Sequence, residues 1–436
     1  MKPINVALLG IGTVGTGTFA VLERNQDEIA RRAGRPIHIA VVADKDIERA
    51  KEITRGACRV TGDAFAVVAD PKIDIVIELI GGCKVARELV LAAIEHGKHV
   101  VTANKALLAM HGNEIFAAAQ RKNVMVAFEA AVAGGIPIIK ALREGLTANR
   151  IEWIAGIING TTNFILSEMR DKALSFDTAL RQAQRLGYAE ADPTFDVEGI
   201  DAAHKLTIMS AIAFGIPMQF ERCHIEGITR LQAEDIRYAE SLGYRIKLLG
   251  ITRRRAEGVE LRVHPTLIPA RRLIANVEGA MNAVLVKGDA VGATLYYGKG
   301  AGAEPTASAV IADLVDVTRM HTADRAHRVP HLAFQPDAVV NIPVLPMSEV
   351  ETSYYLRLRV EDRPGVLADV TRILADQMIS IEAMIQREPA EGEEQTDIIM
   401  LTHRTREKNM DAAIARIEAL PVVKGKALRL RMEELG

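Results

Sequence analysis

The first 130 residues alternate between short apolar runs and amphipathic segments. Apolar runs with the length of a strand occupy residues 4–10, 37–44, 73–82 and 99–105. The segments between these runs repeat their apolar residues at helical spacing. Alternation of this kind predicts an α/β fold with a Rossmann-type, doubly wound parallel sheet over residues 1–130.

The pattern changes after about residue 147. Residues 131–300 combine helical segments with short strand-like runs, which predicts an α+β domain. A glycine-rich loop and an alanine-rich helix follow, and we expect residues 301–330 to complete the nucleotide domain. Prolines then interrupt the periodicity, so residues 331–349 are predicted to be a linker.

Residues 350–436 have a pattern of their own. A strand, a helix, two strands, a second helix and a final strand follow one another, which predicts a small βαββαβ module. An appended module with its own core points to regulation more than to chemistry.

The first strand ends in a glycine-rich loop of the kind that binds dinucleotides. The loop consists of Gly10, Ile11, Gly12, Thr13, Val14 and Gly15. The first glycine allows a tight turn, the second lets the backbone approach a pyrophosphate, and the third lets the next helix pack closely. Free N–H groups at the start of that helix attract the phosphates. The plainer alternative is that the glycines only form a turn.

The end of the second strand, at Ala43 and Asp44, bears on the choice between NAD and NADP. An acidic residue here favours NAD through the ribose hydroxyls, whereas a basic residue can hold the extra phosphate of NADP. Asp44 is followed by Lys45, so both cofactors stay open. Asp44 also lies farther from Gly15 than the usual spacing of about 20 residues, and it could instead cap the following helix.

The composition excludes several classes of partner. The formal net charge is −2 with both signs interspersed, which gives no footprint for nucleic acid or an anionic membrane. The three cysteines are widely spaced and form no paired motif, which suits a reducing compartment. Without a secretory leader pattern or a membrane-spanning apolar run, we expect a cytoplasmic protein.

The densest cluster of chemically useful side chains lies between residues 187 and 205. Asp201 and Lys205 are four positions apart on a predicted helix, so they share one face. A carboxylate in that position can orient and tune an amine that transfers a proton. The common alternative is a surface salt bridge without a catalytic role.

Several motifs together resemble the homoserine dehydrogenase family with a C-terminal ACT domain, and the match spans the whole chain. The motifs are GIGTVG, VVTANKALLA, FEAAVAGGIPII, GIINGTTNFIL and LGYAEADPTFDVEGIDAAHKL. The resemblance implies the reversible reduction of aspartate 4-semialdehyde to homoserine with NADPH or NADH. That reaction lies on the route to threonine, methionine and isoleucine.

The resemblance also implies that residues 131–300 are the domain for substrate binding and dimerisation, and it implies roles for single residues. It makes Lys205 the proton donor in aldehyde reduction and Asp201 the residue that orients the substrate beside it. Lys105 would contact cofactor and substrate and could share the proton work. Glu190 would receive the α-ammonium group of the substrate. Ordinary solvated charges are the alternative for Lys105 and Glu190.

A cation site follows from the same resemblance. FEAAVAGGIPII is similar to the segment that holds a monovalent cation, which we expect to be a structural sodium ion. The implied ligands are the carboxylate of Glu129 and the backbone carbonyls of Val132, Gly134 and Ile136. The alternative is an ordinary strand-to-helix turn. Elsewhere, Gly187 and Gly302 resemble glycines that approach the cofactor.

The sequence DRPGVL resembles the ligand-binding turn of ACT domains. The residues implied to form this regulatory site are Asp362, Gly365, Val366 and Leu367. The resemblance implies feedback inhibition by threonine, bound between paired modules in a homodimer or homotetramer. The alternative is that the module only dimerises.

Two rival functions compete with this reaction, and the sequence speaks against the first of them. A phosphorylating semialdehyde dehydrogenase would need a thiolate nucleophile, and no motif around Cys58, Cys83 or Cys223 would activate one. A non-catalytic sensor would bind dinucleotide and amino acid without consuming either.

Two further residues lie close to Asp201 and Lys205 in the sequence. Asp196 is equally consistent with substrate binding and with a helix cap. We expect His204 to point away from the reaction.

Overall fold

The computed structural model describes residues 2–324, 327–386 and 394–436. These residues form two compact units, each assembled from separate stretches of the chain. The first unit contains residues 1–160, 201–221 and 280–342. The second contains residues 161–200, 222–279 and 343–436.

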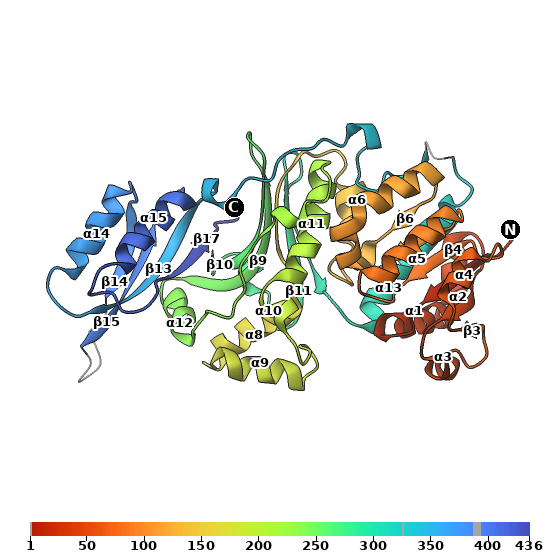
Figure 1. The fold of residues 1–436 in the computed structure, drawn as a ribbon, viewed down its shortest axis with the longest axis horizontal. Coiled ribbons are helices and arrows are strands. Elements are labelled where there is room, and N and C mark those ends of the chain that lie inside the picture. The colour runs from red at the N-terminus through yellow and green to blue at the C-terminus, as the bar shows by residue number, and fades with distance from the viewer. Residues whose placement is uncertain (1, 325–326, 387–393) are drawn as a thin grey trace. The chain divides into compact units, whose positions relative to one another are not determined.

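The first unit is built around a parallel sheet with the strand order β3-β2-β1-β4-β5-β6 (Figure 1). Its strands are β1 (Ile4–Leu9), β2 (Ile37–Ala43), β3 (Arg59–Thr61), β4 (Ile75–Glu78), β5 (His99–Thr102) and β6 (Val126–Ala127). From β1 the strands are added toward one edge of the sheet as far as β3, and from β4 they are added toward the other edge. The boundary between β1 and β4 is thus the switch point where such folds bind ligands. The predicted Rossmann sheet is therefore confirmed.

Two groups of helices accompany this sheet. One group is α1 (Thr13–Arg24), α2 (Gln26–Ala33) and α13 (Ala303–Met320), and the other is α4 (Ala64–Ala69), α5 (Lys84–Glu95) and α6 (Lys105–Lys122). Apolar side chains of α13 join those of β1 and α1 in one buried core. Gly17 lets α1 and α13 approach closely, because a Cβ atom there would lie 2.6 Å from the Ala303 carbonyl oxygen.

The first unit also contains antiparallel strands and the long helix α11 (Ile200–Phe214). Strand β11 (Met281–Gly288) pairs with β7 (Ile151–Ile157) on one side and with β12 (Gly292–Lys299) on the other. Helix α11 is buried on all faces over most of its length. Such burial is typical of a core helix and holds its polar residues rigidly.

The second unit begins with helices α8 (Gly160–Asp171), α9 (Phe176–Arg185) and α10 (Thr194–Val197), followed by α12 (Ala233–Ser241). Its sheet has the order β9-β10-β17-β13-β15-β14, and the short strand β8 (His224–Ile225) pairs with β10. Here β9 spans Tyr244–Arg254 and β10 spans Val259–Pro269.

The predicted βαββαβ module is confirmed within this second unit. Its elements are β13 (Glu351–Glu361), α14 (Val366–Asp376), β14 (Ile381–Gln386), β15 (Gln395–Thr402), α15 (Glu407–Glu418) and β17 (Leu428–Met432), with the short β16 (Thr405–Arg406) before α15. Both helices pack on the strands to form a separate apolar core (Figure 1). The module is not isolated, because its last strand β17 runs parallel to β10 and continues the sheet.

Buried ion pairs reinforce the contact between β17 and the rest of the second unit. Arg431, which is 1% exposed, donates to Glu226 at 2.9 Å and also binds Glu407 of α15. Arg262 of β10 in turn pairs with Glu433 just beyond β17. Removing one partner from such a buried pair would leave an uncompensated charge, so these contacts fix the register between β10 and β17.

Candidate active site

The glycine-rich loop leads from β1 into α1 and leaves room for a ligand. Gly10 has a φ of +94°, and a Cβ atom there would lie 2.7 Å from the Leu79 carbonyl oxygen. A Cβ on Gly15 would lie 2.1 Å from the Gly10 carbonyl oxygen, whereas one on Gly12 would meet nothing within 4 Å. The first turn of α1 carries no acidic residue. An open approach to free N–H groups fits the pyrophosphate of a dinucleotide.

The end of β2 ties this loop to the sheet. The Ile11 N–H donates to the Asp44 carboxylate at 2.7 Å, and the Gly10 N–H donates to the Ala43 carbonyl oxygen at 2.9 Å. The alternative that Asp44 caps the following helix is wrong, because Asp46 is the N-cap of α3 (Ile47–Thr54). Asp44 instead shapes the loop and stands next to the exposed Lys45.

Two lysines and one buried carboxylate meet in the first unit. Lys205 donates to the Asp201 carboxylate at 2.7 Å, and the Lys105 ammonium lies 3.0 Å from the other Asp201 oxygen. Lys205 also donates to the Ile158 carbonyl oxygen at 2.7 Å, and the Asn159 amide donates to Asp201 at 2.8 Å. Asp201 and Lys205, which the sequence spacing placed on one helix face, are therefore part of a buried cluster and do not form a surface salt bridge.

The surroundings of Asp201 keep it ionised. Burial disfavours its charged form, but the positive charges of Lys205 and Lys105 outweigh that effect and hold its pKa well below the usual range. The neighbouring His204 is different, since burial lowers its pKa to about 4. His204 packs on Phe220 with the ring centres 4.3 Å apart. A neutral imidazole against an aromatic ring has no evident part in proton transfer.

Three polar residues at the ends of β4 and β5 support Lys105. The buried Glu78 accepts hydrogen bonds from the Ile80 N–H and the Thr102 hydroxyl, both within 2.9 Å. Asn104 caps α6, the helix that begins at Lys105, and its amide also donates to the Gly82 carbonyl oxygen. Burial raises the pKa of Glu78. Glu78 is a site residue that none of the motifs identified, although a carboxylate at the end of an apolar strand is a usable signal.

The segment after β6 contains the predicted cation ligands. The buried Glu129 carboxylate accepts the backbone N–H groups of Ile139 and Lys140 at 2.9 and 2.8 Å. Burial and the nearby Asp313 carboxylate raise the pKa of Glu129 to about 7. The chain turns through positive φ at Ala133 and Gly134, which redirects carbonyl groups relative to an ordinary helix entry.

A site of this kind rests on backbone carbonyls. Among the residues that the structure describes, no group of three or more His, Cys, Asp and Glu side chains could hold a metal ion. The predicted sodium site combines one carboxylate with the carbonyl oxygens of Val132, Gly134 and Ile136, which are ligands that hard cations accept. Such a site depends mainly on backbone carbonyl oxygens, so a group of acidic, histidine or cysteine side chains is not needed to form it.

The predicted substrate and cofactor residues outside this cluster fall in different places. Glu190 and Gly187 lie in the second unit, in the loop between α9 and α10, where the Glu190 side chain is exposed. The Thr161 hydroxyl of the NGTTN motif donates to the Tyr188 carbonyl oxygen of this loop at 2.6 Å and to Asp196 at 3.1 Å. Gly302 lies in the first unit, where it caps α13 with a φ of +123°.

The predicted regulatory residues line a cavity of about 430 Å³ in the βαββαβ module. Asp362, Gly365, Val366 and Leu367 line it together with Gln386 at the end of β14. The Gln386 amide donates to Asp362 at 3.4 Å. Gly365 has a φ of +95° at the start of α14, a conformation that few residues other than glycine adopt easily.

The first unit thus has a dinucleotide-binding loop and a lysine–carboxylate–lysine cluster beside the carboxyl ends of parallel strands. This combination defines a nicotinamide-dependent oxidoreductase, and the βαββαβ module adds a regulatory element. Comparison with known proteins narrows the class. Residues 10–129 match the NAD-binding domain of homoserine dehydrogenase, residues 137–315 match the homoserine dehydrogenase model, and residues 354–422 match the ACT domain.

Full-length relatives agree with the family models. The chain is 61% identical to a homoserine dehydrogenase of Pseudomonas aeruginosa over 436 residues, covering 100% of both. A homoserine dehydrogenase structure from Thiobacillus denitrificans is 71% identical, with a TM-score of 0.96 and coverage of 100% of this chain and 99% of that one. A Staphylococcus aureus homoserine dehydrogenase is 31% identical, with a TM-score of 0.77 and 99% coverage of each. The chain belongs to the homoserine dehydrogenase family.

Family membership decides against both rival functions. The family consists of oxidoreductases, so a sensor without turnover is not supported. The thiolate that a phosphorylating dehydrogenase needs is also disfavoured, because burial raises the pKa of Cys223 to about 12. Burial raises the pKa of Cys58 and Cys83 as well.

A helix that spans a membrane must be both long enough and apolar enough to cross it. None of the helices within the described residues meets both requirements.

Proposed function

We propose that this chain reduces L-aspartate 4-semialdehyde reversibly to L-homoserine with NADPH or NADH. The observation that carries the proposal is the buried cluster in which Lys205 and Lys105 approach opposite oxygens of Asp201. An aldehyde carbonyl that gains a hydride develops negative charge on oxygen. An ammonium group nearby stabilises that charge and supplies the proton.

Each residue of the cluster has a separate role in this mechanism. When bound, the reduced nicotinamide supplies the hydride. Lys205 protonates the substrate oxygen, while Asp201 and the Ile158 carbonyl oxygen orient its ammonium group. Lys105 is more exposed, with 35% of its side chain accessible, and it contacts the substrate and contributes a second positive charge. Because Asp201 stays ionised, the cluster has one net positive charge to offer the developing alkoxide.

Substitution of the two lysines tests the assignment of roles. We expect Lys205→Ala to lower kcat by about 10²–10⁴-fold, the usual contribution of a positioned proton donor. Lys105→Ala should raise KM as well as lower kcat, because Lys105 is assigned contact with the substrate. Equal kcat in wild type and Lys205→Ala would remove Lys205 from the mechanism.

We assign the substrate's α-ammonium group to Glu190. Its exposed carboxylate is a suitable partner for a cation, and the Thr161–Tyr188 hydrogen bond steadies the loop that bears it. Glu190→Gln should raise KM for aspartate 4-semialdehyde, with a smaller effect on kcat. A KM equal to that of wild type would show that the ammonium binds elsewhere.

Both nicotinamide cofactors remain candidates. The Asp44 carboxylate and the Lys45 ammonium are adjacent, and they suit the ribose hydroxyls of NADH and the 2′-phosphate of NADPH respectively. A hyperthermophilic archaeal homoserine dehydrogenase that is 26% identical, with a TM-score of 0.62, was solved in complex with NADPH. We expect Lys45→Ala to raise KM for NADPH more than KM for NADH, and an equal change in both would refute the role of Lys45.

Sodium is proposed as a structural ion at Glu129. The carboxylate is already oriented by two backbone N–H groups, so its remaining lone pairs are available to join the carbonyl oxygens of Val132, Gly134 and Ile136. A cation would also relieve the repulsion between Glu129 and Asp313. Exchange of sodium for choline should therefore lower thermal stability.

Threonine is proposed as a feedback inhibitor that binds in the cavity at Gly365. The cavity lies next to β14, at the end of the strand order among the described strands. A second module paired there would enclose the ligand, which fits a homodimer or homotetramer. Deleting residues 350–436 is an unsuitable test, since it would remove β17 from β10 and take Arg431 from Glu226 and Glu433 from Arg262.

A point variant tests the threonine site without that damage. Gly365→Ala forces a side chain onto a positive φ at the cavity wall, and we expect it to raise the threonine concentration needed for half-inhibition at least tenfold. Unchanged inhibition would place the effector elsewhere. Light scattering with and without threonine would establish whether the assembly is a dimer or a tetramer.

A further inference from the structure

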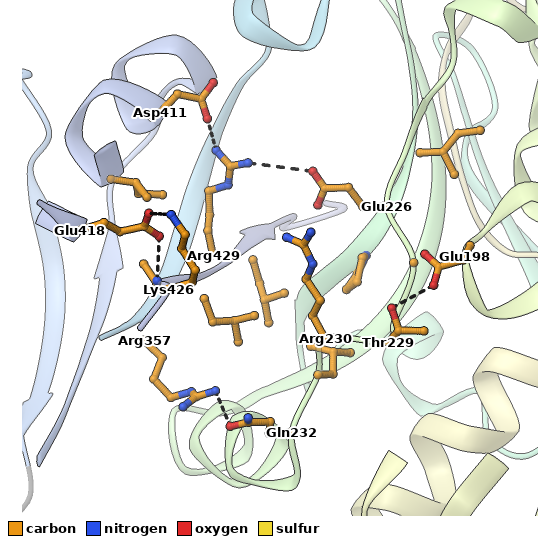
Figure 2. Close-up of a pocket in the computed structure, with 18 of the residues that line it drawn as sticks. Glu198, Glu226, Thr229, Arg230, Gln232, Arg357, Asp411, Glu418, Lys426 and Arg429 are labelled. Atoms are coloured by element: carbon orange, nitrogen blue, oxygen red, sulfur yellow. Dashed lines mark hydrogen bonds and ion pairs between the residues drawn. The ribbon is translucent and has the colours of Figure 1, made fainter. Parts of the chain in front are cut away.

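A larger cavity lies elsewhere in the second unit, between the ACT module and the strands that it joins. Its volume is about 860 Å³. Loop residues 225–232, strand β17 and helix α15 line most of it, and Glu198 contributes from the segment between α10 and α11 (Figure 2). A cavity of this size is within the range that small ligands occupy. None of its lining residues belongs to the catalytic cluster or to the cavity at Gly365.

The acidic and basic residues that line this cavity are equal in number, and most of them are paired with each other or with a charged residue behind the wall. Arg429 binds Asp411, and Lys426 binds Glu418. Arg357 pairs with the buried Asp235 at 2.6 Å. Glu226, another acidic residue at the wall, accepts two hydrogen bonds from Arg431. A balanced wall of this kind suits neither a polyphosphate nor a polyamine, because each would need a large excess of one sign.

Two opposite charges are left without a charged partner. Arg230 makes no hydrogen bond or ion pair with any residue that the structure describes, and its side chain extends into the cavity (Figure 2). Glu198 accepts a hydrogen bond at 3.0 Å from the neutral hydroxyl of Thr229 and forms no ion pair within the described residues. The cavity therefore presents one available guanidinium and one available carboxylate.

We propose that this cavity is a second effector site, which binds an L-α-amino acid with a short apolar side chain. Arg230 would bind the ligand's carboxylate, a group that the planar guanidinium recognises well. Glu198 would bind the α-ammonium group. The apolar part of the ligand has a matching surface in Ile225, Leu231 and Leu430. A zwitterion satisfies both charges at once, whereas a simple carboxylic acid or amine satisfies only one.

The position of Glu198 connects the cavity to catalysis through the chain itself. Glu198 precedes Asp201 by three residues, at the entry to α11. Gly227 packs so closely on this segment that a Cβ atom would lie 2.4 Å from the Val197 carbonyl oxygen and 2.6 Å from the Glu198 Cα atom. The Ile228 N–H also donates to the Val197 carbonyl oxygen at 2.9 Å. A ligand held by Arg230 and Glu198 therefore acts on the backbone that leads into the catalytic helix.

Calorimetric titration of the full chain tests the proposal directly. The probes are L-isoleucine, L-valine, L-methionine and L-threonine. Two analogues of the best binder serve as chemical controls, the amino alcohol without a carboxylate and the 2-hydroxy acid without an ammonium group. We expect at least one amino acid to bind, and both analogues to bind at least tenfold more weakly, since each loses one charge-assisted contact.

Variants of the cavity locate the site. Arg230→Gln and Glu198→Gln should each weaken binding at least tenfold. Arg237→Gln is the matched control, because it makes the same change on the exposed surface of α12. Gly365→Ala separates this site from the other cavity, because it should weaken threonine binding at Gly365 and leave the titrations with the other three amino acids unchanged. In the wild-type enzyme the bound amino acid should change KM for the aldehyde at least twofold, and Arg230→Gln should abolish that change.

Three results would overturn the proposal. The first is that none of the four amino acids binds at concentrations up to tens of millimolar. The second is that binding survives Arg230→Gln and Glu198→Gln in protein with wild-type thermal stability. The third is that Gly365→Ala alone removes the binding of all four amino acids, which would assign all amino-acid binding to the cavity of the ACT module.

Discussion

Replacement of Asp201 by asparagine would keep the shape of the side chain and remove its negative charge. Two ammonium groups would then face each other across a neutral amide in a site where residue 201 is 3% exposed. Breaking a buried ion pair from one side costs about 3–5 kcal/mol. The Lys205 side chain is 10% exposed, so its pair with Asp201 belongs to this class.

The contribution of Lys105 is smaller. Its side chain is 35% exposed, and water screens it, so its pair with Asp201 adds at most about 1 kcal/mol. The asparagine amide keeps a hydrogen-bonding partner for the neighbouring groups, which reduces the loss. We therefore expect Asp201→Asn to lower the free energy of unfolding of the first unit by about 3 kcal/mol and to lower kcat/KM by at least 10²-fold.

The pH dependence follows from the pKa of Asp201. That pKa is lower in the folded protein than in the unfolded chain, so the ionised carboxylate stabilises the fold at every pH above the unfolded value of about 4. The stabilisation is lost as the pH falls through the folded pKa. The difference between wild type and Asp201→Asn should thus be constant from about pH 5 to 8 and shrink in stronger acid.

Urea unfolding followed by tryptophan fluorescence measures this difference in the free energy of unfolding within the first unit, which contains Asp201. The chain has one tryptophan, Trp153 on β7, which is 8% exposed and belongs to the same unit as Asp201. Asp316→Asn is a matched control, because Asp316 also contacts two cations, Lys140 and Arg319, but lies nearer the surface. The control should lose less than about 1 kcal/mol. Equal losses in the two variants, or full activity in Asp201→Asn, would refute the reasoning.

Further predictions concern the glycine loop and the cation site. Gly12→Ala places its methyl group in open space, so KM for the cofactor should rise while the free energy of unfolding changes by less than about 1 kcal/mol. Gly15→Ala should instead destabilise the fold by about 1–3 kcal/mol, because its methyl group overpacks against Gly10. Steady-state kinetics and urea unfolding distinguish the two variants. At the cation site, stability in sodium-free buffer should fall as the pH rises from about 5 to 7. The pKa of Glu129 is raised to about 7 in the folded state. Over this pH range the folded chain therefore retains a proton that the unfolded chain loses. Sodium should remove that pH dependence, and thermal unfolding with choline as the control cation would show whether it does.

Local patterns explain why the sequence predicted much of the fold. The apolar runs that end at Leu9, Ala43 and Thr102 are strands, since a buried parallel strand needs continuous apolar residues. The glycine spacing predicted the loop after β1, and the helical spacing of Asp201 and Lys205 predicted their contact. These features depend on residues that are close together in the chain.

Contacts between distant residues could not be predicted in this way. The Lys205 ammonium reaches the Ile158 carbonyl oxygen, and Glu78 accepts the Thr102 hydroxyl, only because the fold brings separate strands and helices together. The pairing of β10 with β17 also has no local signal, so the ACT module could be recognised but not attached. The charge pairing that leaves Arg230 and Glu198 available in their cavity depends on the same distant contacts.

The most direct test of the proposed chemistry is the rate of NADPH and NADH oxidation with L-aspartate 4-semialdehyde, in wild type and in Lys205→Ala. We predict turnover by the wild type and a loss of about 10²–10⁴-fold in kcat for the variant, with its cofactor binding retained. Absence of wild-type turnover with both cofactors, or an undiminished kcat in Lys205→Ala, would contradict the assignment of proton transfer to the Lys105–Asp201–Lys205 cluster.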